Sequence, residues 1–304
     1  MVEKWRTASG SAHHSKTPLF HYSMSSFLPS LVGSMSVGAA GNPTVAMVET
    51  AFRHHGLHWR YVNMEVPPAG LADAVRGARA MGFRGFNLSM PHKVAVIPLL
   101  DGLGESAALI GAVNCVVRRG AQLIGENTDG KGFLKSLQEI CDPRGKNIVM
   151  FGAGGAARAV AVEIGLVGAK HITVVNRSEP CGRELVETLR TNAKLDAEFV
   201  SWHGDYTLPA GTDIVINATS IGLYDADARL ALNLDSLKPN MVVADVVFSP
   251  PQTRLLCDAA ARGCRTLDGL GMLVNQGVIG VQYWTGVNPD PAAMRRALES
   301  VMEL

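Results

Sequence analysis

The feature that most restricts the fold of this chain is a glycine-rich loop that joins an apolar strand to a helix. Residues 148–151 read Ile-Val-Met-Phe, and the next six are Gly152-Ala-Gly-Gly-Ala-Ala157. This spacing fits G-x-G-x-x-G/A, in which small residues let the backbone approach a pyrophosphate that the helix N-terminus stabilises. Because the pattern alone has a real rate of false matches, the sequence around it must support the interpretation.

The segments that follow the loop continue the alternation of helix and strand. Residues 156–166 have the small and apolar composition of a buried helix. Apolar runs at 171–175, 213–217 and 241–247 are typical of buried parallel strands. The region from 147 to about 265 is therefore predicted to be a doubly wound nucleotide-binding domain of the Rossmann type.

The first half of the chain predicts a second α/β unit. Apolar residues recur at helical spacing in one set of segments and form short runs in another, and a hairpin is expected over 112–125 around Arg118-Arg-Gly-Ala. The alternation predicts a mainly parallel sheet covered by helices. The expected segments are helices at 43–55, 71–81 and 91–100 and strands at 59–66 and 83–88.

Two charged residues lie just beyond short strands of this first unit. Lys93 follows the strand at 83–88, and Asp129 follows the hairpin. Open α/β sheets present their chemistry at such strand ends. A lysine beside a carboxylate can pass a proton to or from an oxygen while a second component moves a hydride. Together with the glycine loop, the pair indicates a dehydrogenase.

Composition excludes several other classes of function. The 304 residues include 28 basic and 27 acidic side chains, so no net field attracts nucleic acid or an anionic membrane, and the substrate is expected to be small. No apolar run reaches the length of a membrane span, and the N-terminus lacks the order of a secretory signal. Five cysteines without a CxxC pair argue for reduced thiols, a cytoplasmic location and no structural zinc.

Residues 1–30 are rich in serine and histidine and have no periodicity, which predicts a flexible extension. His13, His14 and His21 could suggest a metal site. A solvated tail, or an upstream start with Met24 as the working one, explains them better, because no partner ligands stand at metal-site spacing.

The motifs taken together resemble the shikimate dehydrogenase family, which includes quinate/shikimate dehydrogenases. The resemblance rests on Asn87-Leu-Ser-Met-Pro-His-Lys93, Gly111-Ala-Val-Asn114, Asn127-Thr-Asp129-Gly and Leu267-Asp-Gly-Leu-Gly-Met-Leu-Val-Asn-Gln276. It runs from about residue 42 to 286. It implies that Lys93 and Asp129 are the catalytic pair.

The resemblance also implies which side chains bind the ring hydroxyls of the substrate. Ser89 and Asn114 match such positions, as does Gln276 on a helix that returns to the first domain. Asn87 is a further candidate. Each of these residues could instead be a helix cap or a buried structural amide.

The substrate carboxylate is where this chain departs from the family. The usual Ser-x-Ser-Pro stretch is replaced by Gly41-Asn-Pro-Thr44, so that either Asn42 and Thr44 or Ala40 and Asn42 stand for the serines, with Ser34 and Ser36 as alternatives. Phe248 occupies a position where the family commonly has tyrosine. An amide and a hydroxyl at the first of these places can still hold a carboxylate by hydrogen bonds. The loss of the tyrosine hydroxyl weakens the inference of shikimate specificity and allows a lower activity or a different ring substrate.

The second strand of the nucleotide domain ends in Asn176-Arg177-Ser178 rather than in an acid that would bind the ribose of NAD. Arg177 can stack on adenine and bind a 2′-phosphate, with a further bond from Ser178, so NADP is expected. Glu179 could reach the ribose, which leaves NAD possible, and Arg183 is either a second phosphate ligand or a surface charge. The residues expected at the cofactor are Gly152, Ala153, Gly154, Gly155, Ala156, Asn176, Arg177, Ser178, Thr219 and Gly269.

The expected organisation is an extension (1–30), a substrate domain (31–129), a nucleotide domain (130–268) and C-terminal helices that pack back on the substrate domain (269–304). The expected reaction is the reversible NADP-dependent reduction of 3-dehydroshikimate to shikimate by a monomer or homodimer. An NAD-dependent quinate/shikimate dehydrogenase is the nearest alternative. A non-catalytic nucleotide-binding regulator on the same fold is the alternative from another class.

Overall fold

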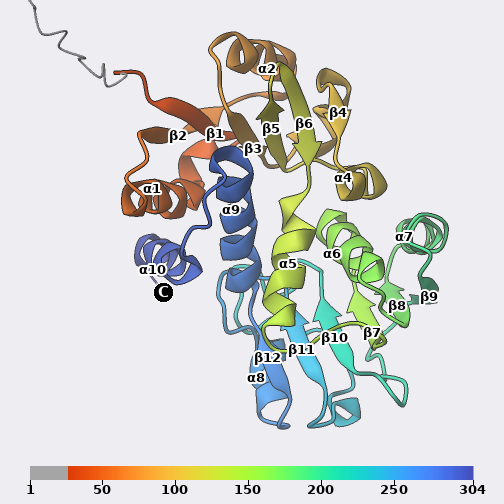
Figure 1. The fold of residues 1–304 in the computed structure, drawn as a ribbon. Coiled ribbons are helices and arrows are strands. Elements are labelled where there is room, and N and C mark those ends of the chain that lie inside the picture. Colours follow the sequence, from red (N-terminus) through yellow and green to blue (C-terminus); the bar gives the residue numbers. More distant parts are fainter. Residues whose placement is uncertain (1–26, 304) are drawn as a thin grey trace, which may run out of the picture.

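The computed structural model describes residues 27–303, which form two six-stranded sheets with helices packed around each (Figure 1). The expectations for most of the N-terminal extension, including His13, His14 and His21, lie outside the described residues. Within these residues, no helix is long and apolar enough to cross a membrane.

The sheet of the first half has the strand order β2-β1-β3-β5-β6-β4. Strand β1 is parallel to β2 and β3, whereas β5 is antiparallel to β3 and β6, as expected of a hairpin inserted into a parallel sheet. Strand β1 was not anticipated and begins where the extension was expected to end. The strands are β1 (Ser30–Ser36), β2 (Trp59–Glu65), β3 (Gly85–Leu88), β4 (Gly102–Leu103), β5 (Cys115–Arg119) and β6 (Gln122–Glu126).

Four α-helices accompany this sheet: α1 (Thr44–His54), α2 (Leu71–Ala80), α3 (His92–Ala95) and α4 (Glu105–Ile110). The helix expected over 91–100 is wrong in its length, because α3 ends at Ala95 and a short 3-10 turn follows at Ile97–Leu99. Pro98 explains the break, since it has no N–H to donate to the preceding turn and its ring clashes with that turn's carbonyl. Lys93 therefore lies on a single turn of helix at the end of β3.

The second sheet is parallel throughout, with the order β12-β11-β10-β7-β8-β9. This is the doubly wound order: the chain runs outward from β7 to β8 and β9, then returns to β10 on the other side of β7 and continues to β11 and β12. The crevice where such folds bind ligands lies at the carboxyl ends of β7 and β10, where the strand order changes. The predicted Rossmann-type fold is confirmed. The elements are β7 (Asn147–Phe151), α6 (Gly155–Leu166), β8 (His171–Asn176), α7 (Glu179–Thr191), β9 (Asp196–Ser201), β10 (Ile214–Asn217), β11 (Val242–Asp245), α8 (Arg254–Ala260) and β12 (Arg265–Leu267).

Two long helices connect the two sheets and pack side by side (Figure 1). They are α5 (Thr128–Gln138) and α9 (Gly269–Thr285). A Cβ at Gly132 of α5 would lie 2.6 Å from the backbone nitrogen of Gln276 on α9, so only glycine allows this close approach. The C-terminal segment forms two helices: α9 ends at Thr285, with Gly286 at a φ of 76° as its C-cap, and α10 (Pro291–Met302) packs on α1.

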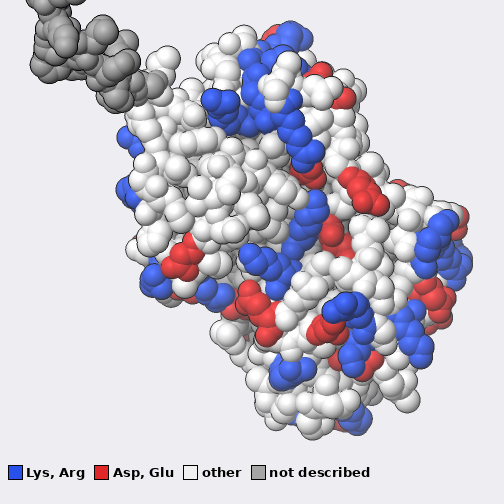
Figure 2. Space-filling view, viewed as in Figure 1, with Lys and Arg blue, Asp and Glu red and all other residues white. Residues whose placement is uncertain are grey.

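On the face drawn in Figure 2, basic side chains gather over α2 and the hairpin β5–β6, and elsewhere basic and acidic side chains lie close together. The arginines of these elements have partners. Arg79 pairs with Asp101 and Arg119 with Glu126, each at 2.9 Å, and Arg118 donates to two backbone carbonyls. These side chains therefore stabilise contacts between α2, the hairpin and the neighbouring segments.

One carboxyl is buried away from the predicted site, where α6 packs on α4. Glu163 of α6 is 6% exposed, and burial raises its pKa, an effect that the nearby Ser106 hydroxyl offsets only in part. Neither Glu163 Oε1 nor Ser106 Oγ has a hydrogen-bond partner among the described residues. The folded state therefore favours the protonated form of Glu163 more than the unfolded state does.

Glu163→Gln should therefore stabilise the protein at neutral pH. A carboxyl with a raised pKa in the folded state costs stability as pH rises above its unfolded pKa of about 4.3, and the amide removes that cost. Thermal melts should show a higher Tm for the variant at pH 7 and no difference below about pH 4. Glu187→Gln, at an exposed position of α7, is the control. A gain of equal size at both pH values would contradict the ionisation argument.

Candidate functional site

The two residues predicted to carry the chemistry lie in direct contact. Lys93 Nζ is 2.7 Å from Asp129 Oδ2, and the two side chains are 29% and 19% exposed. Asp129 is in the first turn of α5, where the side chain of the N-cap residue Asn127 accepts its backbone N–H at 3.1 Å. The cap fixes the direction in which the Asp129 carboxylate leaves the helix.

Asn114 holds the other oxygen of this carboxylate. Its Nδ2 donates to Asp129 Oδ1 at 2.7 Å, and its Oδ1 accepts the backbone N–H of Thr128 at 2.6 Å. The Thr128 hydroxyl lies 3.5 Å from Gln276 Oε1, so α9 reaches the same place. The structure thus brings together four of the predicted site residues: Lys93, Asn114, Asp129 and Gln276.

A row of polar side chains continues from this pair across three strands. Asn63 of β2, Ser34 of β1 and Asn87 of β3 are paired in register. Ser34 Oγ donates to Asn63 Oδ1 at 2.8 Å, and Asn87 Nδ2 donates to the carbonyl of Asn114 at 3.1 Å. The row runs from β2 toward Lys93 and Asp129 and includes Ser34, one of the alternative candidates for the substrate carboxylate.

Tyr61 also supports this row, although it was not among the candidates. Its hydroxyl donates to Asn87 Oδ1 at 2.9 Å, and burial raises the pKa of the phenol, so the donor stays protonated. Asn63 was missed as well. The available signal was an asparagine two residues from a tyrosine in the same strand, which places both side chains on one face.

The loop between β1 and α1 carries the residues that replace the expected serines. Asn42 Oδ1 accepts the backbone N–H of Thr44 at 3.0 Å, and the Asn42 carbonyl accepts from Asn63 Nδ2 at 3.1 Å. Thr44 is buried, whereas Ala40 is exposed, and so is Ser89 at the end of β3. The amide oxygen of Asn42 therefore accepts a bond within the loop, whereas its amide N–H groups can donate to a ligand.

Phe248 lies on the loop after β11, partly buried against the apolar cluster that joins α1, α9 and α10. Asp245 shapes this loop by accepting bonds from Val247 N, Asn217 Nδ2 and Thr253 Oγ1 at 2.8–3.0 Å. Burial raises the pKa of Asp245, and these three donors lower it in part. The loop thus presents an aromatic ring without a hydroxyl to the first domain.

The glycine loop has the shape that a pyrophosphate needs. Gly152 has a φ of 107°, and a Cβ there would lie 2.6 Å from the carbonyl of Ala218. A Cβ at Gly154 or Gly155 would meet nothing within 4 Å, and the Gly154 N-cap of α6 supplies no side-chain bond to the helix. The N–H groups at the start of α6 are therefore open to an anion, beside the small side chains of Ala153 and Ala156.

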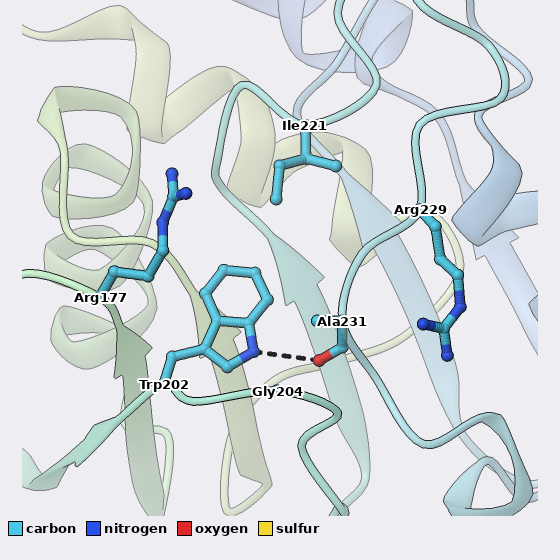
Figure 3. A pocket seen from close by; sticks show the side chains of 6 residues that line it. All are labelled: Arg177, Trp202, Gly204, Ile221, Arg229 and Ala231. Carbon is cyan, nitrogen blue, oxygen red and sulfur yellow. Dashed lines mark hydrogen bonds between the residues drawn. The ribbon is translucent and has the colours of Figure 1, made fainter.

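Arg177, at the end of β8, is exposed and has no hydrogen bond or ion pair among the described residues. It lines a hollow of about 140 Å³, and Figure 3 shows the indole of Trp202 between Arg177 and Arg229, with Ile221 opposite. Trp202 is fixed by its bond to the carbonyl of Ala231 at 3.0 Å. The hollow places an unpaired cation beside an aromatic ring and an aliphatic side chain.

The neighbouring charges are already paired. Arg183 Nε lies 2.7 Å from Glu179 Oε1, and the Arg183 guanidinium lies 5.6 Å from the centre of the Phe199 ring. The surface-charge interpretation of Arg183 fits this arrangement better than phosphate binding. The same pair engages the Glu179 carboxylate that could have reached the ribose.

The remaining cofactor candidates surround these features. Asn176 Nδ2 donates to the carbonyl of Ser178, the N-cap residue of α7. Thr219 bonds Asn217 Oδ1 through its hydroxyl at 2.7 Å. A Cβ at Gly269 would lie 2.2 Å from the carbonyl of Val247, so the absence of a side chain serves packing there.

Comparison with known proteins gives one consistent family. Residues 42–116 match the shikimate dehydrogenase substrate binding domain, and residues 269–299 match the shikimate 5′-dehydrogenase C-terminal domain. The chain is 38% identical to "Shikimate dehydrogenase (NADP(+))" of Alkaliphilus metalliredigens over 89% of this chain and 96% of the relative.

Two solved structures are similar over nearly the whole chain. A ligand-free 5-ketofructose reductase of Gluconobacter sp. strain CHM43 is 55% identical with a TM-score of 0.89, covering 91% of this chain and 100% of that one. Shikimate 5-dehydrogenase from Listeria monocytogenes, in complex with shikimate and NAD, is 33% identical with a TM-score of 0.83 over 89% and 96% of the two chains. The chain belongs to the shikimate dehydrogenase family of NAD(P)-dependent oxidoreductases.

Proposed function

We propose that this protein is an NADP-dependent reductase that converts a ketone of a small, uncharged polyhydroxylated substrate to an alcohol, with 5-ketofructose as the leading candidate. The observation that carries the proposal is the polar row from Asn42 to Lys93. It ends in a lysine–carboxylate pair at 2.7 Å, and apart from that pair it consists of neutral amide and hydroxyl side chains.

The catalytic pair suits proton transfer to the reacting oxygen. A bound nicotinamide cofactor supplies or accepts the hydride. Reduction leaves an alkoxide, and Lys93 Nζ is the donor placed to protonate it, while in the reverse direction the lysine removes that proton. Asp129, fixed by Asn114, keeps Nζ in position and provides an acceptor for the substrate hydroxyl.

The nucleotide domain fits a nicotinamide dinucleotide with a 2′-phosphate. The open start of α6 suits a pyrophosphate, and the hollow beside Trp202 can take an adenine. Arg177 is an unpaired guanidinium at the rim of that hollow, which suits a phosphate better than a ribose diol. The NADP(+) in the name of the Alkaliphilus relative agrees with this choice.

Three features favour an uncharged substrate. The two serines expected to hold a carboxylate are absent, and Phe248 has no hydroxyl to replace the common tyrosine. The 55%-identical neighbour is named for 5-ketofructose, a sugar without a carboxylate.

Shikimate is the second candidate substrate. Lys93, Asp129, Asn114 and Gln276 all match the family's motif and gather in one place, and the Alkaliphilus relative carries that name. A purely regulatory protein would have no use for this assembly. We propose reduction of the ketone as the physiological direction of the reaction.

The substrate assignment can be tested by turnover. With NADPH, 5-ketofructose should be reduced with a kcat/KM at least tenfold above that for 3-dehydroshikimate, because a carboxylate buried without charge-assisted donors loses about 1.5–3 kcal/mol. Phe248→Tyr should narrow the gap by adding a donor. Efficient turnover of 3-dehydroshikimate and none of 5-ketofructose would make shikimate the substrate.

Lys93→Ala should lower kcat by about 10²–10⁴-fold, because among residues 27–303 no other side chain donates a hydrogen bond to Asp129 Oδ2. Binding of NADPH, measured by fluorescence titration, should stay nearly unchanged, since the glycine loop lies in the other domain. An alanine variant with near-parental kcat would remove Lys93 from the mechanism.

Arg177→Ala should weaken NADP binding by roughly 10- to 100-fold, the equivalent of one lost charge-assisted bond, and change NAD binding much less. Calorimetric titration with both nucleotides measures the two effects. Arg183→Ala is the matched control and should leave the ratio of the two affinities unchanged, because Arg183 already pairs with Glu179. Equal losses for both nucleotides in Arg177→Ala would mean that the side chain only stacks on adenine.

A further inference from the structure

Strand β2 carries two polar side chains that no motif singled out, Asn63 and Glu65. They are two residues apart and so project from the same face of the strand. Both reach across to the loop at 37–43, which joins β1 to α1 and carries Asn42. The register of β1 and β2 sets this contact, because Ser34 is opposite Asn63 and Ser36 is opposite Glu65.

Glu65 holds the start of the loop. Its two carboxylate oxygens accept the backbone N–H groups of Gly38 and Ala39, each at 2.8 Å. Gly38 has a φ of 74°, and two successive N–H groups that converge at such a residue form a concavity suited to an anion. In this protein the chain's own carboxylate fills that concavity.

Asn63 holds the end of the loop. Its Nδ2 donates to the carbonyl of Asn42 at 3.1 Å, while its Oδ1 accepts from Ser34 Oγ at 2.8 Å. Since Ser34 is opposite Asn87 in the sheet, Asn63 links the loop to the polar row of the site. One N–H of the Asn63 amide remains for a substrate hydroxyl.

These contacts bear on the choice of substrate. A carboxylate arriving at this end of the site would meet two N–H groups that are already bonded and a fixed negative charge that repels it. A neutral hydroxyl meets no such penalty. On the basis of the function proposed above, we propose that Glu65 and Asn63 are specificity-determining residues that position the 37–43 loop for an uncharged substrate and disfavour a carboxylate.

The test compares two ligands in the parent protein and in Glu65→Ala, Glu65→Gln and Asn63→Ala. The dissociation constants of 5-ketofructose and of shikimate are measured by titration without nucleotide, so that neither ligand can turn over during the measurement. Both Glu65 variants should shift the ratio of the two constants toward shikimate by on the order of tenfold, since a charge is removed and an N–H is freed. Asn63→Ala should weaken 5-ketofructose binding by about fivefold or more through loss of one neutral bond.

Glu49→Gln is the matched control. Glu49 is also a carboxylate that accepts a backbone N–H of β2, from Tyr61 at 2.6 Å, but it lies on α1 and does not touch the loop. It should leave the ratio of the two constants unchanged. Melting temperatures of all variants separate a loss of fold from a change in preference, and Glu65→Gln, which keeps the side-chain volume, serves if Glu65→Ala does not fold.

A proportional loss for both ligands in the Glu65 variants would show that the residue only supports the fold and would overturn the proposal. So would an unchanged ratio. Failure of the proposed function appears elsewhere, in the unsubstituted protein, as turnover of 3-dehydroshikimate without turnover of 5-ketofructose. The two failures are therefore distinguishable.

Discussion

The geometry of the site depends on the hydrogen bonds of the Asn114 side chain. Asn114 follows the buried Val113 just before β5, and its amide has two distinct partners, the Thr128 N–H at 2.6 Å and Asp129 Oδ1 at 2.7 Å. The first bond ties the end of the β5–β6 hairpin to the start of α5, and the second points the Asp129 carboxylate at Lys93. Because α5 also packs on α9 and α6, the orientation of the catalytic pair is coupled to the helices that connect the two sheets.

Much of the nucleotide domain follows from local sequence. Strand β7 is a buried apolar run, and the loop from Gly152 to Gly155 that follows it is rich in glycine, as expected where a ligand or another segment approaches the backbone closely. Such signals need no knowledge of distant parts of the chain, which is why the doubly wound order could be anticipated. The short helix around Lys93 also follows from a local signal, because Pro98 lies within the segment expected to be helical and ends the helix before it.

The substrate end could be predicted only in part, because its contacts depend on strand register. Nothing in the local sequence indicates that Asn63 faces Ser34 and Asn42, since that depends on which strands pair and where. The family motif located Lys93, Asn114, Asp129 and Gln276, which share one catalytic arrangement. Tyr61, Asn63 and Glu65 lie outside that motif, and their roles appear only once β2 is placed beside β1.

The residues proposed for proton transfer and those proposed for substrate selection are held by different parts of the structure. The proposed proton transfer uses Lys93 and Asp129, which the Asn114 side chain and the N-cap of α5 hold without contact to the loop at 37–43. The proposed recognition of the far end of the substrate uses that loop, which β2 holds through Glu65 and Asn63. The two are connected only through the row of side chains across β1 and β3. A change of a few polar residues on β2 and its loop can therefore alter which ring is accepted while the catalytic pair stays in place.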